Sequence, residues 1–346
     1  MPLFVIAFAL AAVISLIATP FVSLLANKTG ALDKPDHRKV HKKPIPRIGG
    51  LAIYVAFMIS VISVLLFADL STEFIKTTVG LLFSASLMML LGLIDDYKNL
   101  PANVKLLGQI IAASILVLFF DVRIDYISDP FGDYIYLEWF AIPATIFWLV
   151  GITNTVNLID GLDGLAAGVS AIAAITILLV ALQDNFLLIV ILTAALAGAA
   201  IGFLFFNFNP ASIFMGDSGA LFLGFTLAAI SIIGSVKSAA TIALFVPILA
   251  LGIPIFDTTF AIIRRIRGHV PIFKPDKGHL HHRLLALGFN HRQAVLLMYV
   301  ISALLGLSAV ALTEVSSQFA ALILILVFVA IIFGAKKIGI FSIRTN

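Results

Sequence analysis

Charged residues are scarce in this sequence and cysteine is absent. Asp, Glu, Lys and Arg make up 12% of the 346 residues, about half of their share in soluble domains. Without cysteine the chain can form neither a disulfide framework nor a thiolate metal site. Hydrophobic residues make up 61% of the chain, and the mean hydropathy is +1.14. This composition excludes a soluble globular protein and predicts an all-α, polytopic membrane protein.

Long apolar runs show where the chain is expected to cross a bilayer. A helix needs about 20 apolar residues to span the hydrocarbon. Pro247 and Pro254 interrupt the ninth such run and predict a broken helix there. Because no internal repeat or linker divides the pattern, residues 1–346 are expected to form a single integral membrane domain. The eleven predicted spans are about 3–26, 48–68, 74–94, 104–120, 139–153, 164–182, 186–206, 218–234, 239–263, 293–312 and 318–335.

The basic residues predict the orientation of these spans. When the connecting segments are assigned alternately to the two sides, all but three of the 22 Lys and Arg residues fall on one side. The exceptions are Lys76, Arg123 and Lys237. An excess of Lys and Arg marks the cytoplasmic side. The N-terminus is therefore expected to be external and the C-terminus cytoplasmic.

Polar residues gather in four clusters at the predicted cytoplasmic ends of spans. A group of costly polar side chains on one face of a membrane protein indicates, by default, a reactive or transporting site. The clusters are Asp95 with Asp96, the run 154–163, the segment 207–217, and the histidines between 279 and 282. We expect one active site formed by the cytoplasmic segments at about 27–47, 95–103, 154–163, 207–217 and 264–292.

The first two clusters are rich in carboxylates and amides. Adjacent carboxylates at Asp95 and Asp96 need a cation, a shared proton or water, so they suit a Mg²⁺ site or a general base. The alternative is a solvated helix end. In the second cluster a polar residue recurs every third position, and glycines allow a broken segment that turns these residues inward. Such residues suit a sugar, a base edge or a metal, whereas helix capping would explain one of them. They are Asn154, Asn157, Asp160 and Asp163.

The other two clusters suit an anionic ligand. Asp217 opens a span, where it could hold a phosphate-bound Mg²⁺ or act as a helix cap. Phe214 could stack on a base or lie at the membrane interface. The histidines His279, His281 and His282 stand beside Arg283 and suit a diphosphate. For them a zinc site and a headgroup-facing loop are the alternatives.

A basic segment at 28–47, which includes His37 and His41, either binds anionic lipid or guides a nucleotide toward the site. Together the clusters predict phosphoryl transfer at the membrane surface with a divalent metal. A secondary transporter is the competing class. A purely structural membrane protein is the least favoured, because it would not need so many costly polar groups.

Four motifs identify a known family. The segments LIDDY at 93–97, NTVNLIDGLDGL at 154–165, FMGDSG at 214–219 and HLHHR at 279–283 resemble the polyprenyl-phosphate N-acetylhexosamine-1-phosphate transferases of glycosyltransferase family 4. The histidine pattern and the eleven spans look like the branch that makes GlcNAc-diphospho-undecaprenol for teichoic acid or O-antigen type polymers. The branch that uses UDP-MurNAc-pentapeptide usually has three consecutive histidines.

The resemblance implies a reaction and its participants. GlcNAc-1-phosphate would pass from UDP-GlcNAc to undecaprenyl phosphate by direct displacement, with release of UMP; a covalent route through Asp95 and another UDP-HexNAc donor stay open. The cofactor would be Mg²⁺, with Mn²⁺ as an alternative. The location would be the bacterial plasma (inner) membrane with the active site in the cytoplasm, with no nucleic acid partner and with a homodimer left open.

The resemblance also implies roles for single residues. Asp217 would bind the metal with help from Asn157. Asp95 would deprotonate or orient the lipid phosphate, with Asp96 and the histidines His279, His281 and His282 completing the catalytic set. One position departs from the peptidoglycan branch, where a lysine follows the acidic pair: here it is Asn99, and Lys98 could substitute. The residues expected to bind substrate are Asn154, Asn157, Asp160, Gly161, Leu162, Asp163, Asn207, Phe214, Lys105 and Arg283.

Overall fold

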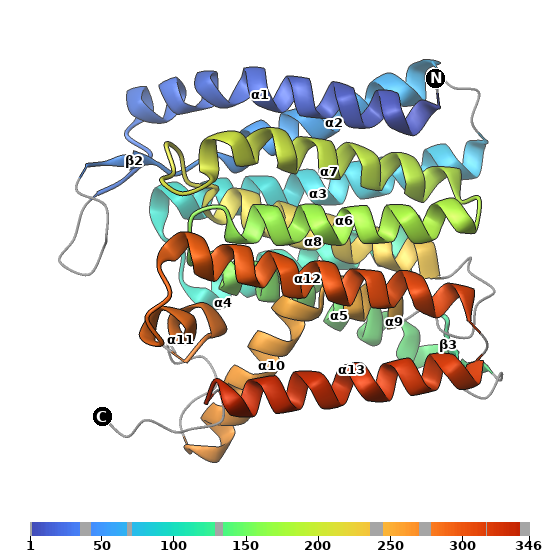
Figure 1. The fold of residues 1–346 in the computed structure, drawn as a ribbon. Helices are drawn as coiled ribbons and strands as arrows, with labels where there is room; N and C mark the ends of the chain where they lie inside the picture. Colours follow the sequence, from blue (N-terminus) through green and yellow to red (C-terminus); the bar gives the residue numbers. More distant parts are fainter. Residues whose placement is uncertain are drawn as a thin grey trace.

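Long helices run side by side through the protein (Figure 1). The computed structural model describes residues 2–34, 43–67, 71–128, 134–235, 245–269, 278–315 and 317–339. Within these residues, ten helices are long and apolar enough to cross a membrane. They are α1 (Leu3–Thr29), α2 (Gly50–Phe67), α3 (Thr72–Lys98), α4 (Ala102–Phe120), α5 (Ala141–Ile159) with the short helix η1 (Glu138–Phe140) before it, α6 (Leu165–Gln183), α7 (Leu187–Asn207), α8 (Gly216–Ser235), α12 (His291–Glu314) and α13 (Ser317–Lys337).

The all-α, polytopic fold class predicted from the sequence is confirmed. Ten of the eleven predicted spans coincide with these ten helices. The ninth predicted span is divided into α9 (Phe245–Ala250) and α10 (Gly252–Arg267), which confirms the predicted break. The physical cause is Pro254, which has no N–H to donate to the carbonyl of Ala250, four residues earlier.

The inner helices of the bundle are α6, α7 and α8. Between 72% and 89% of the apolar window of each is buried inside the protein, against 11% for α13. Helix α7 packs along α1 through small residues. A Cβ atom at Gly202 would lie 2.5 Å from the carbonyl oxygen of Ala12, so only glycine permits this close approach. Two of the predicted site residues lie at the ends of these buried helices, Asn207 at the end of α7 and Asp217 at the start of α8.

Two small hairpins lie at opposite ends of the bundle (Figure 1). At one end β1 (Leu32–Asp33) pairs antiparallel with β2 (Ile45–Pro46), and at the other β3 (Tyr126–Ser128) pairs with β4 (Tyr134–Tyr136). The short helix α11 (Leu280–Ala286) lies at the β2 end. The chain after β2 runs beside the segment before α8. There Phe214 N donates to Pro46 O at 2.7 Å, and Gly50 N donates to Met215 O at 2.8 Å.

Candidate active site

The acidic pair lies in the last turn of α3, and both residues are buried, at 5% and 4% exposure. Helix α3 ends because Asn99 adopts a left-handed conformation with φ 48°. The next residue, Leu100, donates its N–H to Asp95 Oδ1 at 2.7 Å. Asp95 therefore holds the turn that leads into α4.

Asp96 caps a different helix. Its Oδ1 accepts the N–H of Asp217 at 2.9 Å, and its Oδ2 accepts the N–H of Ser218 at 3.0 Å. The first N–H groups of a helix have no partner within the helix and carry partial positive charge. The carboxylate from α3 thus satisfies the N-terminus of α8. Asp217, for which helix capping was one interpretation, lies within the first turn and is itself positioned by Asp96.

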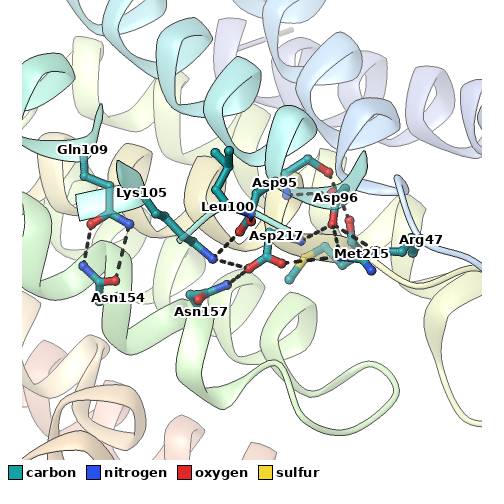
Figure 2. A network of polar contacts seen from close by, with 11 residues as sticks. Arg47, Asp95, Asp96, Leu100, Lys105, Gln109, Asn154, Asn157, Met215 and Asp217 are labelled. Carbon is teal, nitrogen blue, oxygen red and sulfur yellow. Dashed lines mark hydrogen bonds and ion pairs between the residues drawn. The ribbon is translucent and has the colours of Figure 1, made fainter. Parts of the chain in front are cut away.

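Lys105 of α4 lies between the carboxylates of Asp95 and Asp217 (Figure 2). Its Nζ lies 2.6 Å from Asp95 Oδ2 and 2.6 Å from Asp217 Oδ1. Asn157 of α5 donates to the same Asp217 oxygen at 2.7 Å. Ends of four helices, α3, α4, α5 and α8, therefore meet at one carboxylate. The structure brings together Asp95, Lys105, Asn157 and Asp217 as expected for one site.

Arg47 adds a second cation that sequence reasoning did not single out. It is the last basic residue before α2, and its Nη2 lies 3.2 Å from Asp96 Oδ1 and 3.7 Å from Asp217 Oδ2. The backbone pairing of 46–50 with 214–215 holds it there. Its place immediately before a span was the only signal in the sequence. Lys98, considered as a substitute for a family lysine, is exposed and makes no ion pair within the described residues.

Asn154 takes part in a separate pair. Its amide exchanges hydrogen bonds with the amide of Gln109, at 2.7 and 3.3 Å, and it also donates to Val150 O at 2.8 Å. Figure 2 shows this pair to one side of the carboxylates. Asn154 therefore joins α5 to α4, and the structure does not bring it into the acidic network.

The turn between α5 and α6 is broken at its glycines, as the sequence predicted. Gly164 adopts φ 79° ahead of α6. Asp163 Oδ2 accepts hydrogen bonds from Asn209 Nδ2 at 2.9 Å and from Ala211 N at 3.1 Å. Asn207 Oδ1 accepts the N–H of Gly164 at 3.1 Å. Asp163 and Asn207 thus hold the 160–164 turn against the segment that leads to α8, while Leu162 is buried beneath it.

Asp160 is the acid whose charge is least compensated. Its backbone N–H donates to Asn157 O at 3.3 Å, but its carboxyl group forms no hydrogen bond or ion pair with any of the described residues. Burial, and then the carboxylates of Asp217, Asp96 and Asp163, raise the pKa of Asp160 to about 8. A carboxyl group in such surroundings holds a proton at neutral pH unless a cation arrives.

The histidines lie at the start of α11. His279 and His281 are buried, at 5% and 2% exposure, and their rings are parallel within 7° at 5.9 Å. His281 packs on Gly161, where a Cβ atom would lie 2.6 Å from Nε2. Burial, followed by the charge of His282, lowers the pKa of His281 to about 3. His281 is therefore a neutral imidazole that closes over the 160–164 turn.

Two further residues near the histidines were not singled out from the sequence. Asp257 of α10 accepts a hydrogen bond from Leu280 N at 2.8 Å and lies 2.9 Å from His279 Nδ1. His291 of α12 accepts the N–H of Asp163 at 3.0 Å through Nε2. An acid inside the ninth apolar run was a signal for Asp257; nothing in the sequence distinguished His291.

The remaining predicted residues lie around this site. Phe214 lies two residues before α8. Arg283 lies on α11, where its backbone N–H donates to His279 O at 3.1 Å. Within the described residues no three His, Asp or Glu side chains are arranged to hold a metal by themselves, so the histidines do not form a zinc cage there. His37, His41 and the stretches 35–42 and 270–277 of the two longer predicted cytoplasmic segments lie outside the described residues.

Comparison with known proteins places this arrangement in a family. Residues 78–235 match the family model of glycosyl transferase family 4. A probable undecaprenyl-phosphate N-acetylglucosaminyl 1-phosphate transferase of Bacillus subtilis (strain 168) is 44% identical over 330 residues, which cover 95% of this chain and 89% of that protein. The chain belongs to glycosyl transferase family 4, the polyprenyl-phosphate N-acetylhexosamine-1-phosphate transferases.

Two further proteins are also similar to this chain. A decaprenyl-phosphate N-acetylglucosaminephosphotransferase of Mycolicibacterium smegmatis is 37% identical over 314 residues, 84% of this chain and 77% of that protein. A phospho-N-acetylmuramoyl-pentapeptide-transferase of Listeria monocytogenes serovar 1/2a is 36% identical over 241 residues, 65% of this chain and 74% of that protein. The family 4 match contains the whole acidic network except Arg47, and it ends before the histidines.

Asp160→Asn is predicted to remove a pH-dependent loss of stability. The carboxyl pKa is 3.8 in an unfolded chain and about 8 in the fold, so unfolding in this window releases a proton. The wild-type free energy of unfolding should therefore fall as pH rises from about 4 to about 8, and Asp160→Asn should flatten that fall. Thermal unfolding in detergent without divalent metal, between pH 5 and 9, measures it. The exposed Asp184→Asn should follow the wild type; parallel curves for wild type and Asp160→Asn would refute the assignment.

Proposed function

We propose that this protein transfers GlcNAc-1-phosphate from UDP-GlcNAc to undecaprenyl phosphate, releasing UMP and forming GlcNAc-diphospho-undecaprenol. The observation that carries the proposal is the single network in which Lys105 bridges Asp95 and Asp217 at 2.6 Å each. Its motifs lie in a chain 44% identical to the Bacillus subtilis relative. The product would begin a cell-envelope glycopolymer of the teichoic acid or O-antigen type.

Mg²⁺ is the proposed cofactor, with Mn²⁺ as an alternative. Mg²⁺ prefers oxygen ligands and is commonly held by one or two carboxylates together with substrate phosphates. The residues fit such an ion: Asp217 at the start of α8 and Asn157 in the last turn of α5 both offer side-chain oxygens. Asp160 nearby is an acid whose carboxyl group has no counter-ion among the described residues. When bound, the ion would neutralise the donor diphosphate and the departing UMP.

We assign Asp95 and Lys105 to the lipid phosphate. Lys105 would exchange part of its contact with the carboxylates for a phosphate oxygen, and Asp95 would orient that phosphate or take its proton. The attacking phosphate oxygen forms a bond to the β-phosphorus, and the bond from that phosphorus to the bridging oxygen breaks, with its electron pair leaving on UMP. Catalysis of this kind depends on positioning and charge neutralisation, which rigid helix ends provide.

We propose that the nucleoside and the sugar bind at the turn formed by residues 160–164. Asp163 and Asn207 use their side chains to join two loops, so they would shape the pocket. The backbone of Gly161 and Leu162, the Asp160 carboxyl group and the ring of Phe214 would contact the ligand. Of the histidines, His281 is neutral and can cover the diphosphate without adding charge. His282 and Arg283 would lie over the same side.

Three observations bear on the alternatives. The histidine pattern HLHHR favours UDP-GlcNAc. So does the 44% identity over 95% of the chain to the Bacillus subtilis N-acetylglucosaminyl relative, against 36% over 65% of the chain for the Listeria monocytogenes N-acetylmuramoyl-pentapeptide relative. A transporter would need polar groups near the middle of the membrane. Here the acidic network lies where helices α3, α5 and α8 end or begin, so an enzyme at the membrane surface is favoured.

The donor assay tests the function itself. Purified protein with undecaprenyl phosphate and Mg²⁺ is incubated with UDP-GlcNAc, UDP-GalNAc, a UDP-6-deoxy-HexNAc or UDP-MurNAc-pentapeptide, and UMP release is measured. UMP should appear with UDP-GlcNAc and only when the lipid is present. UMP release with only a different UDP-sugar would refute UDP-GlcNAc as the donor and leave the reaction class unchanged. Uptake of a solute into proteoliposomes without UMP release would refute the class.

Asp217→Asn tests the metal assignment. The variant keeps the shape and removes the negative charge, so activity should fall by at least about a hundredfold, roughly 3 kcal/mol in the barrier, while thermal stability is retained. Binding of Mg²⁺ by calorimetry should also weaken. Asp121→Asn, with a side chain 69% exposed at the other end of the bundle, is the matched control. Unchanged Mg²⁺ affinity in Asp217→Asn would contradict the assignment.

The orientation with the active site in the cytoplasm rests on the distribution of Lys and Arg. Because the chain has no cysteine, single cysteines report on it without background. Lys98→Cys lies at the active-site end and Asp184→Cys in the exposed turn after α6. In intact cells a membrane-impermeant maleimide should label position 184 and not position 98. Labelling at both after permeabilisation is the control, and the reverse pattern in intact cells would overturn the orientation.

A further inference from the structure

Asp257 is a buried acid that the acidic network does not use. It lies in the second turn of α10, the helix that follows the break in the ninth span, and is 2% exposed. Asp257 lines an apolar cavity of about 320 Å³, together with residues that include Ile253, Phe256, Phe260 and Leu280. A carboxylate in the wall of such a cavity is costly unless it is paired. The Asp257 carboxylate therefore needs a hydrogen-bond donor or a cation beside it.

Both oxygens of this carboxylate accept hydrogen bonds from the start of α11. Oδ1 accepts the N–H of Leu280 at 2.8 Å, and Oδ2 lies 2.9 Å from Nδ1 of His279. An ionised carboxylate offers only acceptors. His279 must therefore carry its hydrogen on Nδ1, which leaves Nε2 as the nitrogen free for another partner. None of the described residues forms a hydrogen bond with Nε2.

We propose that Asp257 is a positioning residue that fixes the ring of His279 and makes it the histidine that carries charge to the donor diphosphate. In the substrate complex Nδ1–H donates to Asp257 while Nε2, protonated from solvent, donates to a diphosphate oxygen. The carboxylate balances the imidazolium, as an acid does for the histidine of a catalytic triad. This assignment rests on the proposed function, because it takes the diphosphate as the ligand.

The surroundings of His279 separate it from its neighbours. His281, stacked on it, has no carboxylate partner in hydrogen-bonding contact among the described residues, and its pKa is lowered to about 3. Arg264 of α10 is buried against Gly278, where a Cβ atom would lie 2.7 Å from the guanidinium. Among the residues that the structure describes, the charged or titratable groups around the start of α11 also include His282 and Arg283 on α11, His291 on α12 and Asp160 on the α5–α6 turn.

The stack also explains how a residue on α10 reaches the active site. Asp257 holds His279, the ring of His279 lies parallel to that of His281, and His281 rests on Gly161 beside Asp160. These contacts restrict the rotation of the His279 and His281 rings. The break between α9 and α10 lets Asp257 approach α11, so the ninth span serves the site through this carboxylate.

A double-mutant cycle tests the proposal. Asp257→Asn keeps an oxygen for Leu280 N–H and loses the charge opposite His279. We expect kcat for UMP release to fall at least about tenfold, with the KM for UDP-GlcNAc changed less than about threefold. In a His279→Gln background the same substitution should have no further effect, because Asp257 acts through His279.

Asp257→Ala separates positioning from capping. It removes the acceptor for Leu280 N–H as well, so an additional loss of thermal stability should appear in both backgrounds. Thr259→Ala is the control: Thr259 lies two residues after Asp257 on α10, and its side chain is exposed. This substitution should leave kcat, KM and stability unchanged. An equal loss of kcat for Asp257→Asn in the wild-type and His279→Gln backgrounds would overturn the proposal and leave Asp257 a cap.

The cycle is independent of the donor assay. It is run on whichever UDP-sugar the wild type turns over, so failure with UDP-GlcNAc rejects the donor and leaves the coupling measurable. The pH profile gives a second readout. The imidazolium would be less stable opposite Asn, so the alkaline limb of kcat in Asp257→Asn should move to lower pH by at least about half a unit. An unshifted limb would overturn the role in carrying charge.

Discussion

The capping of α8 by Asp96 is the interaction on which the site depends. A helix that starts near hydrocarbon exposes N–H groups that must find acceptors, and Asp96 accepts two of them from another helix. This contact joins α3 to α8 and sets the direction in which Asp217 leaves the first turn. Asp95, one residue earlier, then faces Lys105. The adjacent acids thus have different tasks because each points to a different partner.

Charge balance explains why the network is compact. Asp95, Asp96 and Asp217 are matched by Lys105 and Arg47 at distances between 2.6 and 3.7 Å. Buried or half-buried carboxylates repel one another unless cations lie between them. Asp160 lacks such a partner among the described residues, and its pKa is raised to about 8. A donor diphosphate entering with a divalent cation would bring the missing positive charge, which links binding of substrate to this acid.

Hydrogen bonds to backbone and amide groups, together with the packing of His281, hold the loops over that charged centre. Asp163 and Asn207 bind backbone and amide groups across the two loops, His291 accepts the N–H of Asp163, and His281 packs on Gly161. Several residues expected to touch substrate therefore also build the walls of the site. Asn154, paired with Gln109, contributes to the frame in the same way. A mutation at any of them would change the shape of the pocket together with its contacts.

Much of this protein follows from its sequence alone. The length and apolarity of the runs determine the spans, because the bilayer sets the length of a helix and demands that backbone groups be satisfied within it. Pro247 and Pro254 mark the broken ninth span because proline lacks an N–H. The order and type of the acids, amides and histidines identify the family, because that chemistry needs those groups together.

Tertiary structure alone decided which of these groups meet. Asp96 proved to be a cap and Asn154 the partner of Gln109. Arg47 reaches the carboxylates, and Asp257 reaches His279, from distant segments of the chain. Spacing along one chain cannot reveal such pairs, since each depends on how helices from different parts of the sequence rotate and pack. The direction of a side chain is set by the neighbouring helix, and that neighbour is chosen only when the whole bundle is buried.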